Sequence, residues 1–244
     1  MGLNTYLITG GTAGIGLATA KQLVQQGHHV VITGRNAEKL EKVAAGLSGD
    51  VTAILCDSER HEDTLALGKR LQEKGIQLDG VVLNAGVYFP NPFDSTTLDE
   101  FEHTMNINFK APFFTLQSLL PVLKLSSSVV MVSSLVVNKA FADSSIYTAS
   151  KAALEGLVAT LNLDLADRGI RINSVRPGVT ATEIQKKAGM SAEGFGELQE
   201  AMTSTPLGRI LEVSDIVPSI EFLLSKGSLG MRNAVLDIDA GLGL

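Results

Sequence analysis

Short runs rich in β-branched residues alternate with longer amphipathic stretches along the whole sequence, and this alternation most constrains the fold. Strands that alternate with helices assemble into a parallel sheet with helices on both faces. Because the crossovers between parallel strands are right-handed, the pattern predicts an α/β fold built on a doubly wound, seven-stranded parallel sheet. The predicted strands are Thr5–Thr9, His29–Thr33, Val51–Leu55, Gly80–Leu83, Ser128–Ser133, Ile170–Val175 and Ala234–Ile238.

The chain has 244 residues, and nothing in its sequence marks a boundary to a second domain. Hydrophobic residues make up 45% and charged residues 19%, which is typical of a globular protein and excludes a disordered one. We therefore expect a single domain over residues 1–244. One segment, residues 183–206, is punctuated by glycines and has weak helical periodicity. Such an insertion after a strand is often a lid or binding loop, and a pair of ordinary surface helices is the alternative.

Charge and composition limit the partners that this chain can have. The formal net charge is −6 without a basic run, which argues against binding to duplex nucleic acid. No apolar run reaches the roughly 18–20 residues of a membrane span, and the first residues lack the features of a signal peptide. The single cysteine, Cys56, excludes an intramolecular disulfide, and the four histidines lack metal-ligand spacing. We expect a cytoplasmic protein that binds a small molecule and no metal.

A glycine-rich turn directly follows the first predicted strand. It reads Thr9-Gly10-Gly11-Thr12-Ala13-Gly14-Ile15-Gly16 and opens the first predicted helix. Glycines here allow a sharp turn, and they bring backbone N–H groups and a helix N-terminus close to a phosphate. The spacing Gly-x-x-x-Gly-x-Gly differs from the usual dinucleotide fingerprint. The position of the turn after the first strand nevertheless predicts a dinucleotide site.

The end of the second predicted strand indicates which dinucleotide binds. An acidic residue there would bond the ribose 2′-hydroxyl of NAD, whereas an arginine accommodates the 2′-phosphate of NADP. The chain has Gly34 followed by Arg35, and an arginine can bind a phosphate through two parallel N–H groups. We therefore expect NADP(H) to be preferred over NAD(H). The alternative is that Arg35 is a solvated loop residue.

Three polar side chains are candidates for proton-transfer chemistry. Tyr147 and Lys151 are four residues apart on a predicted helix, Ile146–Leu165, so both can face one site. A free tyrosine has a pKa near 10, and a nearby ammonium favours the phenolate. Tyr-x-x-x-Lys alone also occurs by chance in many helices. Ser134 ends a strand, where a hydroxyl can donate to a substrate carbonyl oxygen as that oxygen gains negative charge.

Two further features belong to the same predicted edge of the sheet. Asn84-Ala85-Gly86 ends another strand, and ligands bind outside the carboxyl ends of strands in sheets of this kind. Its backbone is therefore expected to line the same crevice. Asn108 lies on a predicted helix, Phe101–Leu123, where a buried asparagine needs hydrogen-bond partners such as backbone and water.

These pieces together resemble the short-chain dehydrogenase/reductase family, in that family's order and spacing and over essentially the whole chain. The resemblance implies a Rossmann fold and hydride transfer from C4 of a nicotinamide to a carbonyl carbon. The matching pieces are the turn Thr9–Gly16, Asp57, Asn84-Ala85-Gly86, Asn108, Ser134, Tyr147 with Lys151, and Pro177-Gly178 followed by Thr182.

The resemblance also implies a role for each matching residue. Tyr147 would be the general acid in reduction and the base in the reverse direction, and Ser134 would polarise the carbonyl. Lys151 would hold the nicotinamide ribose hydroxyls and lower the pKa of Tyr147. Asn108 would hold a water that links Lys151 to solvent, and Asp57 would contact the adenine. The implied cofactor contacts are Gly10, Thr12, Gly14, Ile15, Gly16, Arg35, Asp57, Asn84, Ala85, Gly86, Tyr147, Lys151, Pro177, Gly178, Val179 and Thr182.

The resemblance also implies a homo-oligomer, as a tetramer rather than a dimer. We expect the enzyme to reduce a ketone or aldehyde reversibly to an alcohol with NADPH. Tyr88, Phe89, Val136 and Val137 near the predicted crevice favour a small to medium, largely apolar substrate. The alternatives within enzymes are a 3-oxoacyl-(carrier protein or CoA) reductase and a sugar-nucleotide epimerase or dehydratase, which is usually a longer chain. The alternative of another class is a non-catalytic NADP(H)-binding redox sensor, which would have no need of the phenol.

Three positions depart from the family's pattern. Small residues often follow the catalytic serine in the family, whereas this chain has Leu135-Val136-Val137, which should narrow the pocket or make it more apolar. Asn233 stands where the family has a glycine before the last strand. Asp239-Ala240-Gly241 stands where the family has Asp-Gly-Gly.

Overall fold

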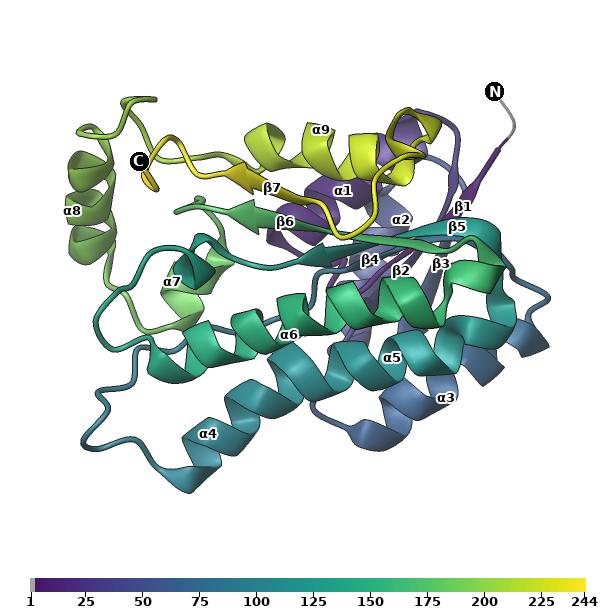
Figure 1. Ribbon diagram of the computed structural model, residues 1–244, viewed down its shortest axis with the longest axis horizontal. Helices are drawn as coiled ribbons and strands as arrows, with labels where there is room; N and C mark the ends of the chain where they lie inside the picture. Colours follow the sequence, from purple (N-terminus) through teal and green to yellow (C-terminus); the bar gives the residue numbers. More distant parts are fainter. Residues whose placement is uncertain (1–2) are drawn as a thin grey trace.

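Seven strands form one sheet in the computed structural model, which describes residues 3–244 (Figure 1). They are β1 (Thr5–Ile8), β2 (His29–Gly34), β3 (Val51–Leu55), β4 (Leu78–Leu83), β5 (Leu123–Val132), β6 (Arg171–Pro177) and β7 (Val235–Ile238). All neighbours pair in parallel, in the order β3-β2-β1-β4-β5-β6-β7. The winding therefore reverses between β1 and β4, and the predicted doubly wound, seven-stranded parallel sheet is confirmed.

Helices cover both faces of this sheet (Figure 1). One face carries α1 (Gly14–Gln25), α2 (Ala37–Gly46) and α9 (Val213–Leu224), and the other carries α3 (His61–Glu73), α5 (Ala111–Leu119) and α6 (Ser145–Asp164). Each layer buries its own apolar cluster, with Leu23 and Ile220 in the first and Leu71 and Leu154 in the second. Because the strands are buried on both faces, they read as continuous β-branched runs rather than as alternating patterns.

Shorter helices complete the chain. They are α4 (Leu98–Met105), the π-helical turn η1 (Asn106–Lys110), α7 (Glu183–Lys187), α8 (Ala192–Met202), and the 3₁₀ turns η2 (Leu120–Val122), η3 (Leu135–Val137), η4 (Ala166–Arg168) and η5 (Lys226–Ser228). Figure 1 shows α7 and α8 beyond the carboxyl ends of the strands, with the C-terminus beside α8. These two helices make up most of the predicted lid segment, residues 183–206.

The predicted helix Phe101–Leu123 is wrong in two respects. The π-helical turn η1 interrupts it, and Leu123 already belongs to β5 and pairs with Leu78 of β4. The early start of β5 has a physical reason, since Ser126 adopts a left-handed conformation (φ 61°) and the register between β4 and β5 shifts beside it. The polar residues at this irregularity, Ser126–Ser128, interrupt the continuous apolar run by which a buried strand is recognised in a sequence.

Asn233 and Ala240 stand where the resemblance expects glycines, and both have a left-handed backbone. Their φ angles are 57° and 63°. Asparagine tolerates this conformation, whereas an alanine Cβ costs roughly 1–2 kcal/mol there. The turn at Ala240 is held by the Leu207 N–H, which donates to the Ala240 carbonyl oxygen (3.2 Å). The chain therefore keeps the turn after β7 without the glycine that would relieve the strain.

Candidate active site

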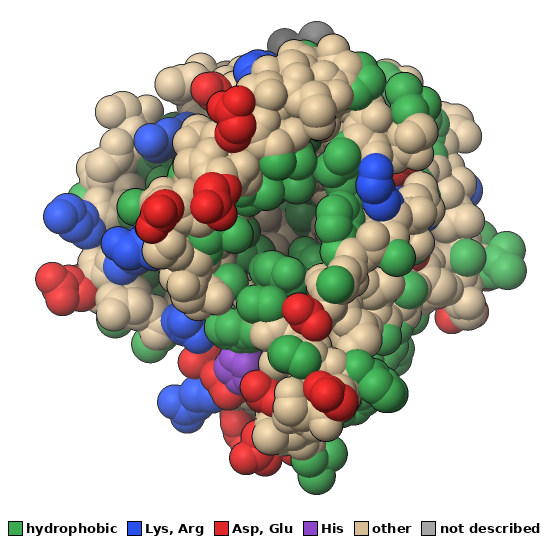
Figure 2. Space-filling model, turned by 90° about the vertical axis from the view of Figure 1, so that its left-hand side faces the viewer, with side chains coloured by type: hydrophobic (Ala, Val, Ile, Leu, Met, Phe, Trp, Pro, Cys, Tyr) green, Lys and Arg blue, Asp and Glu red, His purple; other side chains and the backbone are tan. Residues whose placement is uncertain are grey.

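One cavity of about 460 Å³ opens at the carboxyl ends of the strands, where the winding of the sheet reverses. Figure 2 looks into its mouth, a hollow surrounded mainly by hydrophobic side chains. Nearly every residue singled out in the sequence lines it. These are Gly10, Thr12, Gly14, Ile15, Arg35, Asp57, Asn84, Ala85, Gly86, Ser134, Tyr147, Lys151, Pro177, Gly178, Val179 and Thr182. Gly16 and Asn108 lie behind its wall instead.

The glycine turn forms one side of the cavity. Gly10 and Gly14 have left-handed backbones, with φ angles of 65° and 51°. A Cβ on Gly16 would lie 2.5 Å from both the Gly10 carbonyl oxygen and Asn84 Nδ2, so α1 can approach the turn only with glycine here. The Asn84 amide itself donates to the Thr9 carbonyl oxygen (2.9 Å). The first turn of α1 is thereby held against the cavity, in the position that suits an anion.

Arg35 lies on the exposed rim of the cavity, immediately after β2. A Cβ on Gly34 would lie 2.8 Å from Thr12 Cγ2, so the end of β2 packs directly against the glycine turn. Asp57 stands on the same side, and its Oδ1 accepts from the Glu59 N–H (3.1 Å). The neighbouring Cys56 is buried, and burial raises the pKa of its thiol to about 11, so it is a small apolar residue rather than a nucleophile.

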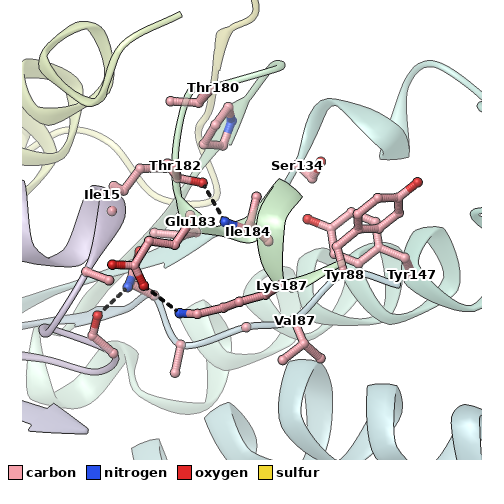
Figure 3. Close-up of a pocket in the computed structure, with 18 of the residues that line it drawn as sticks. Ile15, Val87, Tyr88, Ser134, Tyr147, Thr180, Thr182, Glu183, Ile184 and Lys187 are labelled. Carbon is pink, nitrogen blue, oxygen red and sulfur yellow. Dashed lines mark hydrogen bonds and ion pairs between the residues drawn. The ribbon is translucent and has the colours of Figure 1, made fainter. Parts of the chain in front are cut away.

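The three expected catalytic side chains meet at the opposite side of the cavity. Tyr147 and Lys151 lie one turn apart on α6, and Ser134 follows β5. The Lys151 Nζ lies 5.8 Å from the centre of the Tyr147 ring and donates to the Val132 carbonyl oxygen (2.9 Å). The Tyr88 ring packs edge-on against the Tyr147 ring, 5.0 Å between centres (Figure 3).

Burial dominates the electrostatics of this cluster. It raises the pKa of Tyr147 to about 12, against the opposing effect of a hydrogen bond with Ser134. Burial also lowers the pKa of Lys151, which is only 4% exposed, to about 8. That Lys151 lowers the pKa of Tyr147 stays a prediction; here one donor of the lysine ammonium is directed at the Val132 carbonyl oxygen. Both groups are therefore biased toward their neutral forms.

Asn108 sits in the π-helical turn η1 and is 1% exposed. Its Oδ1 accepts from the Val87 N–H (2.9 Å), and its Nδ2 donates to the Val87 carbonyl oxygen (2.9 Å) and to Ser150 Oγ (3.1 Å). Both amide hydrogens are thus used to hold the loop after β4 against α6. The water that Asn108 was expected to hold between Lys151 and solvent would therefore have to bond an atom of this turn other than the Asn108 amide hydrogens. Gly86 lies beside both side chains, since a Cβ there would be 3.3 Å from Asn108 Oδ1 and 3.4 Å from Lys151 Nζ.

The segment over residues 183–206 is a pair of helices that also lines the cavity. Ile184, Met190 and Leu198 contribute apolar wall. Glu183 forms ion pairs with Lys39 of α2 and with Lys187, both at 3.0 Å, and these cations hold the pKa of its carboxyl below the usual range. Figure 3 shows the Glu183–Lys187 pair on the wall of the cavity facing Tyr147.

The sequence predicted only some of the apolar residues that line the cavity. Tyr88 and Val136 line the cavity as expected, together with Val87 and Phe141. Phe89 packs against His103 instead, 5.6 Å between ring centres. Phe141, Met190 and Leu198 come from loops and a partly exposed helix, where hydrophobic periodicity does not indicate which residues face a ligand.

Two kinds of feature are missing from residues 3–244. No group of three histidine, cysteine, aspartate or glutamate side chains could hold a metal ion there. Within the same residues, no helix combines the length and the apolar character that crossing a bilayer requires.

Comparisons with known proteins identify the family. A family model described as "Enoyl-(Acyl carrier protein) reductase" matches residues 10–243. Dehydrogenase/reductase SDR family member 4 of Homo sapiens is 34% identical over 248 residues, which cover 96% of this chain and 86% of the human protein. The chain belongs to the short-chain dehydrogenase/reductase family. It is therefore an oxidoreductase of a family that binds a nicotinamide cofactor.

Other relatives of this short-chain dehydrogenase/reductase have more specific names. An NADP-dependent (R)-specific alcohol dehydrogenase of Lentilactobacillus kefiri is 31% identical, over 96% of this chain and 94% of that one. The 3-oxoacyl-[acyl-carrier-protein] reductase FabG of Rickettsia bellii is 30% identical, over 98% and 96%. A short-chain dehydrogenase/reductase structure from Brucella melitensis has a TM-score of 0.90 at 28% identity, over 99% and 96%. A blue fluorescent protein from a metagenomic library, solved with NADPH, has a TM-score of 0.88 at 29% identity, over 99% and 98%.

Proposed function

We propose that this enzyme uses NADP(H) to reduce a ketone or aldehyde reversibly to an alcohol. The observation that carries the proposal is the meeting of Ser134, Tyr147 and Lys151 in the same cavity as the glycine turn. A redox sensor that only binds a dinucleotide would not need a phenol and an ammonium group lining the cavity. A sugar-nucleotide epimerase would need a larger substrate region than the helix pair over residues 183–206.

The residues of the cavity fit a dinucleotide. The left-handed glycines Gly10 and Gly14 and the closely packed Gly16 leave backbone, not side chains, facing the space beside α1. This is the environment that a pyrophosphate prefers. Arg35 on the rim would bind a 2′-phosphate, while Asn84, Ala85, Gly86, Pro177 to Val179 and Thr182 would line the remainder of the cofactor. Bound there, the nicotinamide would supply the hydride for the carbonyl carbon.

The side chains of the chain itself would handle the proton. Ser134 would donate a hydrogen bond to the carbonyl oxygen, and Tyr147 would transfer its proton to that oxygen as negative charge develops. One hydride on carbon and one proton on oxygen complete the alcohol, and the reverse reaction returns both. Lys151 has three donors, of which one is used by the Val132 carbonyl. The other two remain for the ribose hydroxyls and for stabilising the phenolate.

The wall of the cavity supports a largely apolar substrate. Val87, Tyr88, Val136 and Phe141 line it near Tyr147, and Ile184, Met190 and Leu198 line the side formed by the helix pair. The alternative, a 3-oxoacyl reductase, is supported by the FabG relative. Lys187 on this side of the cavity is paired with Glu183, which leaves less positive charge for an anionic substrate. We propose that the helix pair over residues 183–206 closes over the substrate as a lid.

The assembly and location of the enzyme are also proposals. Exposed apolar side chains on α4 and α6, including Leu98, Phe101 and Leu163, support self-association. The family resemblance favours a tetramer rather than a dimer. We propose a cytoplasmic homo-oligomer that binds neither nucleic acid nor a membrane. Light scattering of the purified protein measures the assembly, and a monomeric mass contradicts it.

The reaction is tested by following NADPH oxidation with a panel of aryl and alkyl ketones and aldehydes. The wild type should oxidise NADPH with several of these, and Tyr147→Phe should lose nearly all turnover while it still binds NADPH. Tyr88→Phe is the matched control, because it removes a phenol from the same cavity and leaves Tyr147 in place. Turnover by Tyr147→Phe at the wild-type rate would contradict the assignment of the acid, and greater activity on 3-oxoacyl thioesters would favour the alternative.

A further inference from the structure

A carboxylate lies behind the candidate catalytic residues on the same helix. Glu155 follows Lys151 by four residues on α6, as Lys151 follows Tyr147, so the three share one face of the helix. Its side chain is 12% exposed. A largely buried carboxylate is costly unless it is paired, and Arg176 of β6 pairs with it in a bidentate manner, Nε to Oε1 at 2.7 Å and Nη2 to Oε2 at 2.5 Å.

Glu155 also holds the end of β5. Its Oε1 accepts from Ser133 Oγ at 2.5 Å, while the Ser133 N–H donates to the Val175 carbonyl oxygen of β6 at 2.8 Å. The residues on either side of Ser133 are Val132, whose carbonyl accepts from Lys151, and Ser134. Consecutive side chains of an extended segment point to opposite sides, so anchoring Ser133 to α6 directs Ser134 into the cavity. The anchor therefore sets the position of Ser134 relative to Tyr147.

We propose that Glu155 is a positioning residue for this active site, which fixes Ser134 through Ser133 and places a negative charge one helical turn from the Lys151 ammonium. The inference deepens the proposed function, and its kinetic test rests on that function. The test of the effect of Glu155 on Lys151 does not depend on the proposed function, because Lys151 can be titrated directly.

The charges around Lys151 give the sign of the effect. On α6 it faces Tyr147 and Glu155, and the neighbouring strands add Arg176 of β6 and, beyond it, Asp237 of β7, which lies 3.5 Å from Arg176 Nη1. Gly86 in the loop after β4 lies beside Lys151 and Asn108, since a Cβ there would be 3.4 Å from Lys151 Nζ and 3.3 Å from Asn108 Oδ1, and both Gly86 and Asn108 are uncharged. Burial pulls the pKa of Lys151 down, and Glu155 opposes it. Removing the Glu155 charge should therefore lower the pKa of Lys151 further.

The reductive direction needs Tyr147 and Lys151 both protonated. Loss of the first proton, from either group, would then end activity as the pH rises. A nearby negative charge makes that first loss harder, whichever of the two groups gives up the proton. In Glu155→Gln the alkaline limb of the plot of kcat against pH should therefore move to lower pH. A role in stability alone would reduce the amount of folded enzyme and leave the limb in place.

The direct experiment is an NMR titration of the full chain labelled with ¹³C at lysine Cε. The Lys151 resonance is identified by its loss in Lys151→Met. In Glu155→Gln we expect its midpoint to fall by about one pH unit. Asp237→Asn is the matched control, because it removes a carboxylate from the far side of Arg176. The midpoint of Lys151 in this variant should stay within about 0.3 pH unit of the wild-type value, since a more distant, solvent-screened charge has a smaller effect. An unchanged midpoint in folded Glu155→Gln would overturn the electrostatic claim.

The kinetic experiment uses acetophenone and NADPH as probes. Ser133→Ala retains the Glu155 charge and removes one buried hydroxyl, so it keeps the test decisive even if Glu155→Gln does not fold. We expect it to lower kcat about five- to tenfold, with KM and the limb of the pH profile unchanged, as loss of one anchoring hydrogen bond implies. A wild-type kcat in Ser133→Ala would overturn positioning through Ser133. If the wild type does not reduce ketones, the proposed function fails, while the NMR midpoints still decide the electrostatic claim.

Discussion

The burial of Lys151 should make the stability of the enzyme depend on pH in an unusual direction. Lysine in an unfolded chain has a pKa near 10.4, whereas burial lowers the pKa of Lys151 in the folded protein to about 8. Between these values the unfolded state binds more protons than the folded state. The free energy of unfolding therefore rises with pH in this window, and the penalty is largest below pH 8. Integrated from pH 7 to pH 10, this single group contributes a rise of about 2.5 kcal/mol.

The assay is urea unfolding of the wild type and Lys151→Met between pH 7 and pH 10. Methionine has similar length and no charge, so the other titrating groups cancel in the difference between the two proteins. The wild type should gain about 2.5 kcal/mol relative to Lys151→Met across this range. Parallel pH dependences would refute the reasoning, since they would show that Lys151 has the same pKa in the folded and unfolded chains.

Three further predictions concern the cofactor site and the turns. In a fluorescence titration, Arg35→Ala should weaken NADPH binding about 10- to 100-fold, which is the loss expected for hydrogen bonds to a phosphate, and leave NADH affinity unchanged. Equal losses for both cofactors would contradict selection by Arg35. Gly16→Ala would place a Cβ 2.5 Å from the Gly10 carbonyl oxygen, so it should lower the free energy of unfolding by about 1–3 kcal/mol; urea unfolding at the wild-type midpoint would show that the turn is not tightly packed. Ala240→Gly should raise the free energy of unfolding by about 0.5–1 kcal/mol. It relieves the strain of the left-handed backbone (φ 63°), although the greater conformational entropy of glycine in the unfolded chain offsets part of this stabilisation. A lower melting temperature would contradict the prediction.

The strands and the cavity residues could be predicted because their signals are local. Val30, Val31 and Ile32 are buried on both faces of the sheet and therefore form a continuous β-branched run. Polar residues and glycines that follow such runs necessarily gather at the carboxyl edge, which brought Asn84, Ser134 and the glycine turn together.

The remaining features depend on contacts between distant elements. The Glu155 carboxylate meets Arg176 of β6 and Ser133, which follows β5, and no spacing in the sequence indicates that these three residues come together. The pKa directions of Tyr147 and Lys151 follow from how deeply the fold buries them, which the four-residue spacing cannot show. The spacing suggested a depressed tyrosine pKa, whereas burial raises it.

The start of β5 and the course of the Asn108 helix were missed for a similar reason. A left-handed residue at Ser126, within an irregular stretch of β5, and a π-helical turn at Asn106–Lys110 both interrupt regular structure and break its periodicity. The π-helical turn accompanies the burial of Asn108, whose amide then bonds the Val87 backbone.

The central claim is that the chain carries hydride from NADPH to a carbonyl carbon, with Tyr147 supplying the proton. The most direct measurement incubates the wild type with NADPH deuterated at C4 and the best ketone of the panel, and then analyses the product alcohol by mass spectrometry. We predict one deuterium on the carbinol carbon with the wild type, and almost no alcohol with Tyr147→Phe under the same conditions. An alcohol without deuterium, or an equal yield from Tyr147→Phe, would contradict the account.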